Sequence, residues 1–331
     1  MTERAPASPA RALPITHDHG ACGHHRGAQH IYVYSPSGAV RDKLAIRRAV
    51  KRLQQMGHEV ELDPDASSRS ARFAGDDATR LTAIHRAAAS GADVAMMTRG
   101  GYGLTRLLPE IRYKALARAI ERGTRFIGMS DFTALQMALL ARTGAMTWAG
   151  PLLGADLGVK EEPDEIMLAC LHDVFSGDGE GTGWRLPRES EGVLPRELHD
   201  APLWGGNLAV LCSLVGTPWL PQIDRGVLFL EDVGEHPYRI ERMLTQLLHA
   251  GVLARQRAVL LGQFTGYRRV PGDGGFSMAT VVAWLRSRTK VPVLTGLPFG
   301  HVATKVALPV GARVSLSVHG REAFIVWGHL H

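Results

Sequence analysis

Short apolar runs typical of strands alternate with segments of helical character in the first half of the chain. The strand-like runs span residues 30–38, 58–62, 92–103 and 125–130. The segments whose apolar positions recur every three or four residues span residues 39–57 and 76–91. Strands that alternate with helices predict a parallel sheet whose crossover helices cover its faces, and reactive groups then collect where the strands end.

The second half of the chain has a more mixed pattern. Helical spacing occurs over residues 205–216, 238–251 and 278–288, and strand-like runs occur over 226–233, 258–264, 291–297, 312–318 and 323–328. Residues 177–183 read GDGEGTG, and so many glycines are not expected in a packed element. We therefore expect an N-terminal domain over 30–176, a linker over 177–183 and a C-terminal domain over 184–331.

Residues 1–29 show neither the strand nor the helix period and are rich in Pro, Ala, Arg and His, which predicts a mobile tail. The tail contains side chains of metal-binding type, namely His17, His19, Cys22, His24 and His25. Their spacing matches no closed zinc site, so we expect a His-rich tail without a functional metal site.

The composition narrows the classes of protein to consider. The 331 residues, of which 45% are hydrophobic, suffice for two packed cores. The net charge of +6 comes from scattered basic residues, whereas a nucleic-acid binder needs a basic patch or stripe. A mildly basic surface also suits a small anionic substrate. The chain has no apolar run of ~18 residues, no signal-peptide core and no close cysteine pair. We expect a cytoplasmic protein that binds neither nucleic acid nor membrane.

One hydroxyl group lies at the junction between a predicted strand and a predicted helix. Ser130 follows the apolar run that begins at Arg125 and precedes the helical spacing of residues 132–140. A sharp turn at such a junction lifts a serine off the sheet, and the free N–H groups of the next helix can stabilise an oxyanion. In GMSDF, however, Phe132 stands where the G-x-S-x-G motif has its second glycine, so an ordinary N-cap serine remains the alternative.

A nucleophilic serine needs a base, and the base needs an acid that orients it. Among fifteen histidines we single out His301, which follows a strand-like run, a Pro and a Gly and therefore projects from an anchored loop. A plain surface-turn histidine is the alternative. Glu231 and Asp232 both end the apolar run GVLFL, and alternation does not decide between them because both faces of that strand are apolar.

Five segments in this order carry a family resemblance: TRGGYG, GMSDFTAL, LWGGNL, LFLEDVGEHPYRIERMLTQL and GLPFGHVATKVALPVG. Together they resemble the LD-carboxypeptidase family of serine peptidases, the muramoyltetrapeptide carboxypeptidases, over about residues 31–317. The resemblance implies an α/β fold with an N-terminal parallel-sheet domain, a C-terminal β-rich α/β domain and an active site between them. It also implies a homodimer that needs no metal or other cofactor.

The resemblance assigns roles to three of the candidate residues. The family's Ser-Glu-His triad maps onto Ser130 as nucleophile, Glu231 as acid and His301 as base. The sequence departs from the family in its 29-residue tail and at Met129, where relatives often carry an aromatic residue. Because Met129 lies beside the nucleophile, the side-chain preference for substrate stays open.

Further residues follow from the position of the nucleophile. We expect the backbone N–H groups of Gly101 and Asp131 to bind the oxyanion, because Gly101 lies in a glycine loop at a neighbouring strand end and Asp131 directly follows Ser130. Less directly, we expect the substrate cleft to be lined by Arg99, Tyr102 and Asn207.

The implied activity is that of a serine carboxypeptidase acting on a small peptide. It would remove the terminal D-amino acid, D-Ala, from an L,D-linked murein tetrapeptide during cell-wall recycling. One alternative is a self-immunity hydrolase that cleaves peptide-nucleotide antibiotics with the same triad, as a relative within the family does. Another is a non-catalytic binding module that keeps the fold, although the intact triad argues against it.

Overall fold

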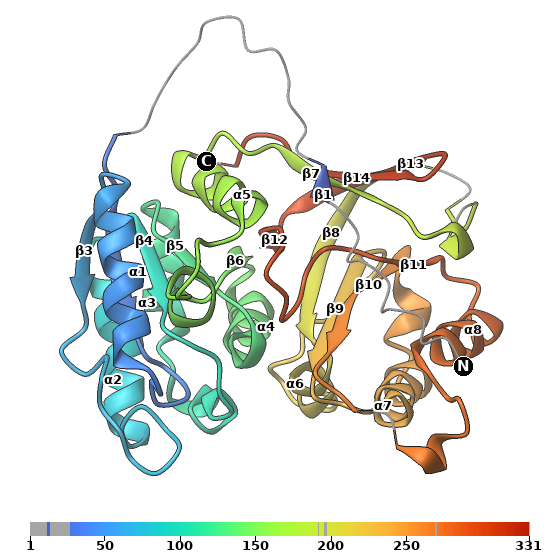
Figure 1. The fold of residues 1–331 in the computed structure, drawn as a ribbon, viewed down its shortest axis with the longest axis horizontal. Coiled ribbons are helices and arrows are strands. Elements are labelled where there is room, and N and C mark those ends of the chain that lie inside the picture. The colour runs from blue at the N-terminus through green and yellow to red at the C-terminus, as the bar shows by residue number, and fades with distance from the viewer. Residues whose placement is uncertain (1–11, 14–26, 191, 195–196, 269, 331) are drawn as a thin grey trace, which may run out of the picture.

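The computed structural model describes residues 12–13, 27–190, 192–194, 197–268 and 270–330. They form two sheets, each with its own helices, that lie side by side (Figure 1). In this part of the chain, no helix is both long enough and apolar enough to cross a membrane.

The N-terminal sheet is six-stranded and parallel except at one edge. In spatial order its strands are β12 (Leu308–Val310), β6 (Thr147–Ala149), β5 (Arg125–Gly128), β4 (Val94–Met97), β2 (His30–Tyr34) and β3 (Glu59–Leu62). The helices of this half are α1 (Lys43–Gln55), α2 (Asp77–Ala89), α3 (Tyr113–Glu121), α4 (Thr133–Thr143) and α5 (Glu165–Ser176). Because β12 pairs antiparallel with β6, the far end of the sequence completes this sheet.

The N-terminal sheet is buried on both faces. Ile31 and Val33 of β2 belong to the hydrophobic cluster that contains residues of α1 and α5. Tyr32 and Tyr34 belong to the other cluster, together with residues of α2, α3 and α4. Successive strand residues point to opposite faces, so helices cover both faces of the sheet (Figure 1). The predicted parallel sheet with crossover helices is confirmed.

The C-terminal sheet is eight-stranded and mixed, which confirms the predicted β-rich α/β half. In spatial order its strands are β1 (Ala12–Leu13), β7 (Gly181–Arg185), β14 (Glu322–Val326), β13 (Arg313–His319), β8 (Leu198–Asn207), β9 (Val227–Val233), β10 (Ala258–Thr265) and β11 (Val293–Thr295). Its helices are α6 (Leu208–Ser213), α7 (Pro237–His249) and α8 (Met278–Arg288). The long strand β8 pairs antiparallel with β13 and then parallel with β9, so it joins the antiparallel and parallel parts.

Two predicted segments differ in detail from what the structure contains. In the predicted linker 177–183, Gly177 ends α5, but residues 181–183 already belong to β7. Pairing with β14 satisfies the backbone of these residues, so their glycines do not prevent a strand. In the predicted tail 1–29, Ala12 and Leu13 form β1. The five metal-binding side chains predicted in the tail lie outside the described residues.

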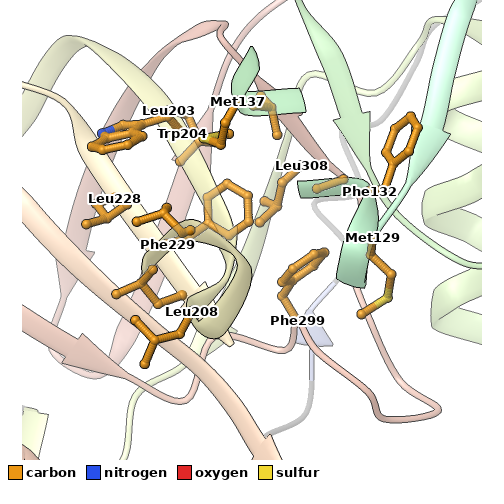
Figure 2. Packing of buried hydrophobic residues seen from close by; sticks show 14 of the residues in the cluster. Met129, Phe132, Met137, Leu203, Trp204, Leu208, Leu228, Phe229, Phe299 and Leu308 are labelled. Atoms are coloured by element: carbon orange, nitrogen blue, oxygen red, sulfur yellow. The ribbon is translucent and has the colours of Figure 1, made fainter. Parts of the chain in front are cut away.

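A continuous hydrophobic cluster joins the two halves. It contains Met129 and Phe132 from the first half and Phe229, Phe299 and Leu308 from the second, each at most 1% exposed. Figure 2 shows Phe229, Phe299 and Leu308 between the strands of the C-terminal sheet and the segment that carries Met129 and Phe132. Residues next to Ser130 are therefore held by a core to which both sheets contribute.

Candidate active site

Ser130 occupies a strained turn between β5 and α4. It begins the short helix η3 (Ser130–Phe132), and its φ of 65° lies in the left-handed region that non-glycine residues rarely adopt. Such a conformation costs on the order of 1–3 kcal/mol and is typical of a serine held out from a sheet for reaction. The N-cap alternative does not fit this geometry, because Met129 is the N-cap of η3 and Phe132 that of α4.

The glycine loop after β4 lies directly against the nucleophile. A Cβ atom on Gly100 would come within 2.6 Å of Ser130 Oγ, so only glycine allows this approach. Next to it, Gly101 is one of the predicted oxyanion donors. The other is the N–H of Asp131, which lies in the first turn of η3, where backbone N–H groups have no acceptor within the helix. The structure thus brings the loop that carries Gly101 to the nucleophile.

The side chain of Asp131 is buried and links the turn to the glycine loop. Its Oδ2 accepts hydrogen bonds from Ser37 Oγ at 2.5 Å and from the N–H of Leu104 at 2.8 Å. Burial raises the pKa of Asp131, and these two hydrogen bonds oppose the rise. The backbone N–H of Asp131 is therefore held in place by its own side chain.

The structure places His301 against Glu231. His301 Nδ1 lies 2.8 Å from Glu231 Oε2, and the carboxylate is fully buried whereas the imidazole side chain is 23% exposed. This contact leaves Nε2 as the nitrogen that can exchange a proton with a substrate or a nucleophile. No hydrogen bond links Ser130 Oγ to another described residue, and such bonds are often long before substrate binds.

The neighbouring acid, Asp232, is engaged elsewhere. Its Oδ2 accepts from the N–H of Ala209, at the start of α6, and its Oδ1 accepts from the N–H of Val233 and from Asn207 Nδ2. Burial is the main cause that raises the pKa of Asp232 to about 6, and the nearby charge of Glu231 adds to the rise. The three hydrogen bonds oppose it. Asp232 therefore supports the start of α6, while Glu231 contacts the histidine.

Asn207 contacts both Glu231 and Asp232. Its Nδ2 donates to Glu231 Oε1 at 3.2 Å and to Asp232 Oδ1 at 3.0 Å, while its Oδ1 accepts from the N–H of Val210 and caps α6. We predicted that Asn207 lines the substrate cleft, whereas the contacts of this buried side chain are with the two carboxylates and the helix. An asparagine directly before a helix is the sequence signal for this capping role.

The other two predicted cleft residues lie in or beside the glycine loop. Arg99 is half-buried and its Nη1 donates to the carbonyl of Ala39 at 3.0 Å. Tyr102 is exposed, and its ring centroid is 5.9 Å from that of Phe73. In the part of the chain that the structure describes, neither residue forms a hydrogen bond with Ser130, Glu231 or His301.

Sequence reasoning missed a buried ion pair that contacts Met129, the residue before Ser130. Lys305 Nζ lies 2.5 Å from Asp156 Oδ1 and 3.8 Å from Met129 Sδ, and the two charged side chains are 2% and 8% exposed. Next to it, Thr304 Oγ1 donates to Asp164 at 2.6 Å. These contacts attach the segment that follows His301 to the N-terminal half. The sequence offered no signal for them, because the partners are more than a hundred residues apart.

A cavity of about 420 Å³ lies at this position and reaches His301. Met129 and Lys305 line it together with four acidic residues, Asp156, Glu161, Glu162 and Asp164. The cavity therefore leaves room for a ligand beside His301. Within the described residues, no group of three or more His, Cys, Asp or Glu side chains is placed to hold a metal ion.

Comparison with known proteins identifies the family of this chain. The model of the LD-carboxypeptidase N-terminal domain matches residues 31–150, and that of the LD-carboxypeptidase C-terminal domain matches residues 200–316. The protein belongs to the LD-carboxypeptidase family. The two matched regions contain Ser130, Glu231 and His301 of this chain.

Individual members of the LD-carboxypeptidase family show how far the similarity extends. The murein tetrapeptide carboxypeptidase of Pseudomonas aeruginosa is 31% identical over 286 residues, which cover 85% of this chain and 91% of the relative. The crystal structure of muramoyltetrapeptide carboxypeptidase from Oxalobacter formigenes has a TM-score of 0.81 at 36% identity, covering 90% of this chain and 98% of that one. The microcin C7 self-immunity protein MccF of Escherichia coli is 27% identical over 264 residues, 71% of this chain and 74% of the relative.

We predict that the two adjacent acids differ in their effect on turnover. Glu231→Gln keeps the shape of the side chain but removes the charge that offsets an imidazolium at His301, so kcat should fall by on the order of 10³–10⁴. Asp232→Asn should lower kcat by about tenfold or less, since Asp232 does not contact the imidazole. Steady-state kinetics near neutral pH on both variants, with folding checked by circular dichroism, makes the comparison. A crippled Asp232→Asn enzyme beside an active Glu231→Gln enzyme would contradict the assignment of the acid.

We also predict that the Lys305–Asp156 pair can be removed only as a unit. Lys305→Met leaves the carboxylate of Asp156 buried without its cation and should lower the free energy of unfolding by about 3–5 kcal/mol. Adding Asp156→Asn removes the uncompensated charge, keeps an acceptor for the N–H of Leu152, and should recover most of the loss. Urea unfolding of the two variants and the wild type measures this. Equal losses in the single and double variants would show that the charge is not what matters.

Proposed function

We propose that this protein is a serine LD-carboxypeptidase that removes D-Ala from the C-terminus of an L,D-linked murein tetrapeptide in cell-wall recycling. The observation that carries the proposal is the 2.8 Å contact between His301 Nδ1 and Glu231 Oε2, in a protein whose Ser130 occupies a strained turn. The substrate is inferred from the relatives named for murein peptides.

The proposed reaction begins with acylation of Ser130. Nε2 of His301 takes the hydroxyl proton as Oγ attacks the carbonyl carbon of the scissile amide, and Glu231 stabilises the imidazolium that forms. The N–H groups of Gly101 and Asp131 donate to the resulting oxyanion. When the tetrahedral intermediate collapses, the C–N bond breaks and His301 gives its proton to the departing amine of the D-amino acid.

Deacylation reverses these roles. Water attacks the ester carbonyl while His301 Nε2 accepts its proton, and the second tetrahedral intermediate expels Ser130 Oγ, which regains a proton from His301. The products are a shortened peptide with a new carboxylate and a free D-amino acid. No redox partner or metal ion is needed to balance these steps.

The alternative substrate is a peptide-nucleotide antibiotic. The observation that favours it is the 27% identity to MccF, which is named as a microcin C7 self-immunity protein. The same triad would cleave either compound, since both reactions begin with attack of a serine on an acyl carbon. Incubating the pure protein with murein tetrapeptide and, separately, with a peptidyl-nucleotide distinguishes them by the mass of the released fragment.

We predict that Ser130→Ala abolishes release of D-Ala while binding of the tetrapeptide persists. The change removes the nucleophile and little volume, so kcat should fall by on the order of 10³ or more. Mass spectrometry of the products measures turnover, and calorimetry measures binding. The exposed Ser287→Ala on α8 is the matched control and should behave like the wild type. Near-normal turnover by Ser130→Ala would refute the proposed mechanism.

A further inference from the structure

Four arginines surround a second hollow beside the glycine loop. The hollow has a volume of about 370 Å³ and is lined by Arg41, Arg69, Arg72 and Arg99, together with Gly38, Ala39, Val40, Ala71 and Gly101. We call it the arginine pocket. Its lining contains no Asp or Glu side chain.

The arginines of this pocket lack acidic partners within the described chain. Arg99 donates to the carbonyl of Ala39, Arg69 donates to the carbonyl of Ala71 at 3.3 Å, and Arg72 lies 5.8 Å from the ring centroid of Tyr102. None of the four forms an ion pair with a carboxylate in the part of the chain that the structure describes. Most of their N–H donors are therefore available to a ligand.

The backbone of the pocket is shaped to admit one guanidinium closely. A Cβ atom on Gly38 would lie 2.7 Å from the carbonyl oxygen of Gly100 and 3.1 Å from Arg99 Nη1, so a larger residue would push against both. Burial lowers the pKa of Arg99, and the charges of Arg41 and Arg72 lower it further. Like charges thus crowd together without compensation, and an anion among them would relieve the repulsion.

The arginine pocket adjoins the nucleophile. Gly101 lines it, and the preceding Gly100 lies against Ser130 Oγ. The N–H of Gly38, which also lines the pocket, donates to the carbonyl of Gly100 at 3.3 Å and so attaches this part of the pocket to the glycine loop. The cavity that contains His301 has an acidic lining instead. The surroundings of the reacting atoms therefore carry positive charge on the side of the glycine loop and negative charge on the side of the base.

We propose that the arginine pocket is an anion-binding subsite that binds an oxyanion group of the substrate, a carboxylate or a phosphate. The identity of the substrate rests on the proposed function. A murein tetrapeptide supplies carboxylates, and a peptide-nucleotide supplies a phosphate. Planar guanidinium groups bind both by paired hydrogen bonds.

The test compares binding to two proteins that lose the same charge. Arg69→Gln/Arg72→Gln removes two exposed arginines of the pocket, and Arg47→Gln/Arg118→Gln removes two exposed arginines of α1 and α3 outside it. Both pairs are made in the Ser130→Ala protein, so that no probe is consumed. The probes are murein tetrapeptide, the same peptide with its C-terminal carboxylate converted to an amide, and inorganic pyrophosphate, each titrated by calorimetry at low salt.

The proposal predicts a loss specific to the pocket. At least one probe should bind roughly tenfold or more weakly to Arg69→Gln/Arg72→Gln than to the control pair, and added salt should shrink the difference. A loss for the acid but not for the amide identifies the terminal carboxylate as the bound group. Equal losses for acid and amide identify another carboxylate of the peptide, and a loss for pyrophosphate alone identifies a phosphate.

The outcome that overturns the proposal is equal affinity of the pocket variant and the control for all three probes. This result is independent of turnover. If the wild type releases no D-Ala, the proposed function fails, yet the pyrophosphate titration still decides whether the pocket binds anions. In an active enzyme, the pocket substitutions should raise KM for an anionic substrate and leave kcat nearly unchanged.

Discussion

The candidate active site depends on the docking of β12 against β6. Ser130 follows a strand of one sheet and Glu231 lies on a strand of the other, so neither half of the chain contains the site alone. His301 comes only seven residues before β12, and between them Thr304 and Lys305 bind carboxylates of the N-terminal half. Antiparallel pairing, a buried ion pair and the shared apolar core therefore act on one short segment. They attach the segment that carries His301 to the N-terminal half.

The same region shows how buried charge is tolerated. An isolated carboxylate in an apolar interior is costly, and removing its partners leaves a large penalty. Asp131, Glu231 and Asp232 are each at most 3% exposed, yet each accepts at least two hydrogen bonds or contacts a basic group. The donors include backbone N–H groups near helix starts, which have no partners within their helices. Backbone N–H groups at helix starts and buried carboxylates thus supply one another's hydrogen-bond partners around the site.

Local pattern predicted much of the fold, and motifs supplied the candidate triad, but neither predicted the long-range contacts around it. The alternation of strands and helices correctly predicted the parallel sheet, because that pattern is a property of neighbouring residues. Alternation did not separate Glu231 from Asp232, and the structure explains why: both side chains are buried, and Asn207 donates to both. The pairing of Lys305 with Asp156 and the gathering of four arginines join segments distant in sequence. Only the folded chain brings them together.

The strain at Ser130 and the crowding of positive charge nearby belong to one arrangement. A left-handed serine is unfavourable by itself, and it persists because Asp131 is fastened to Ser37 and Leu104 while Gly100 permits close approach. The same glycine loop leads back to Arg99, whose guanidinium is held against the Ala39 carbonyl. Gly100 must lack a side chain because Ser130 lies against it, and the next residue, Gly101, lines the arginine pocket. Arginines from other segments line the same pocket. The glycine loop that Ser130 requires therefore also borders the arginine pocket.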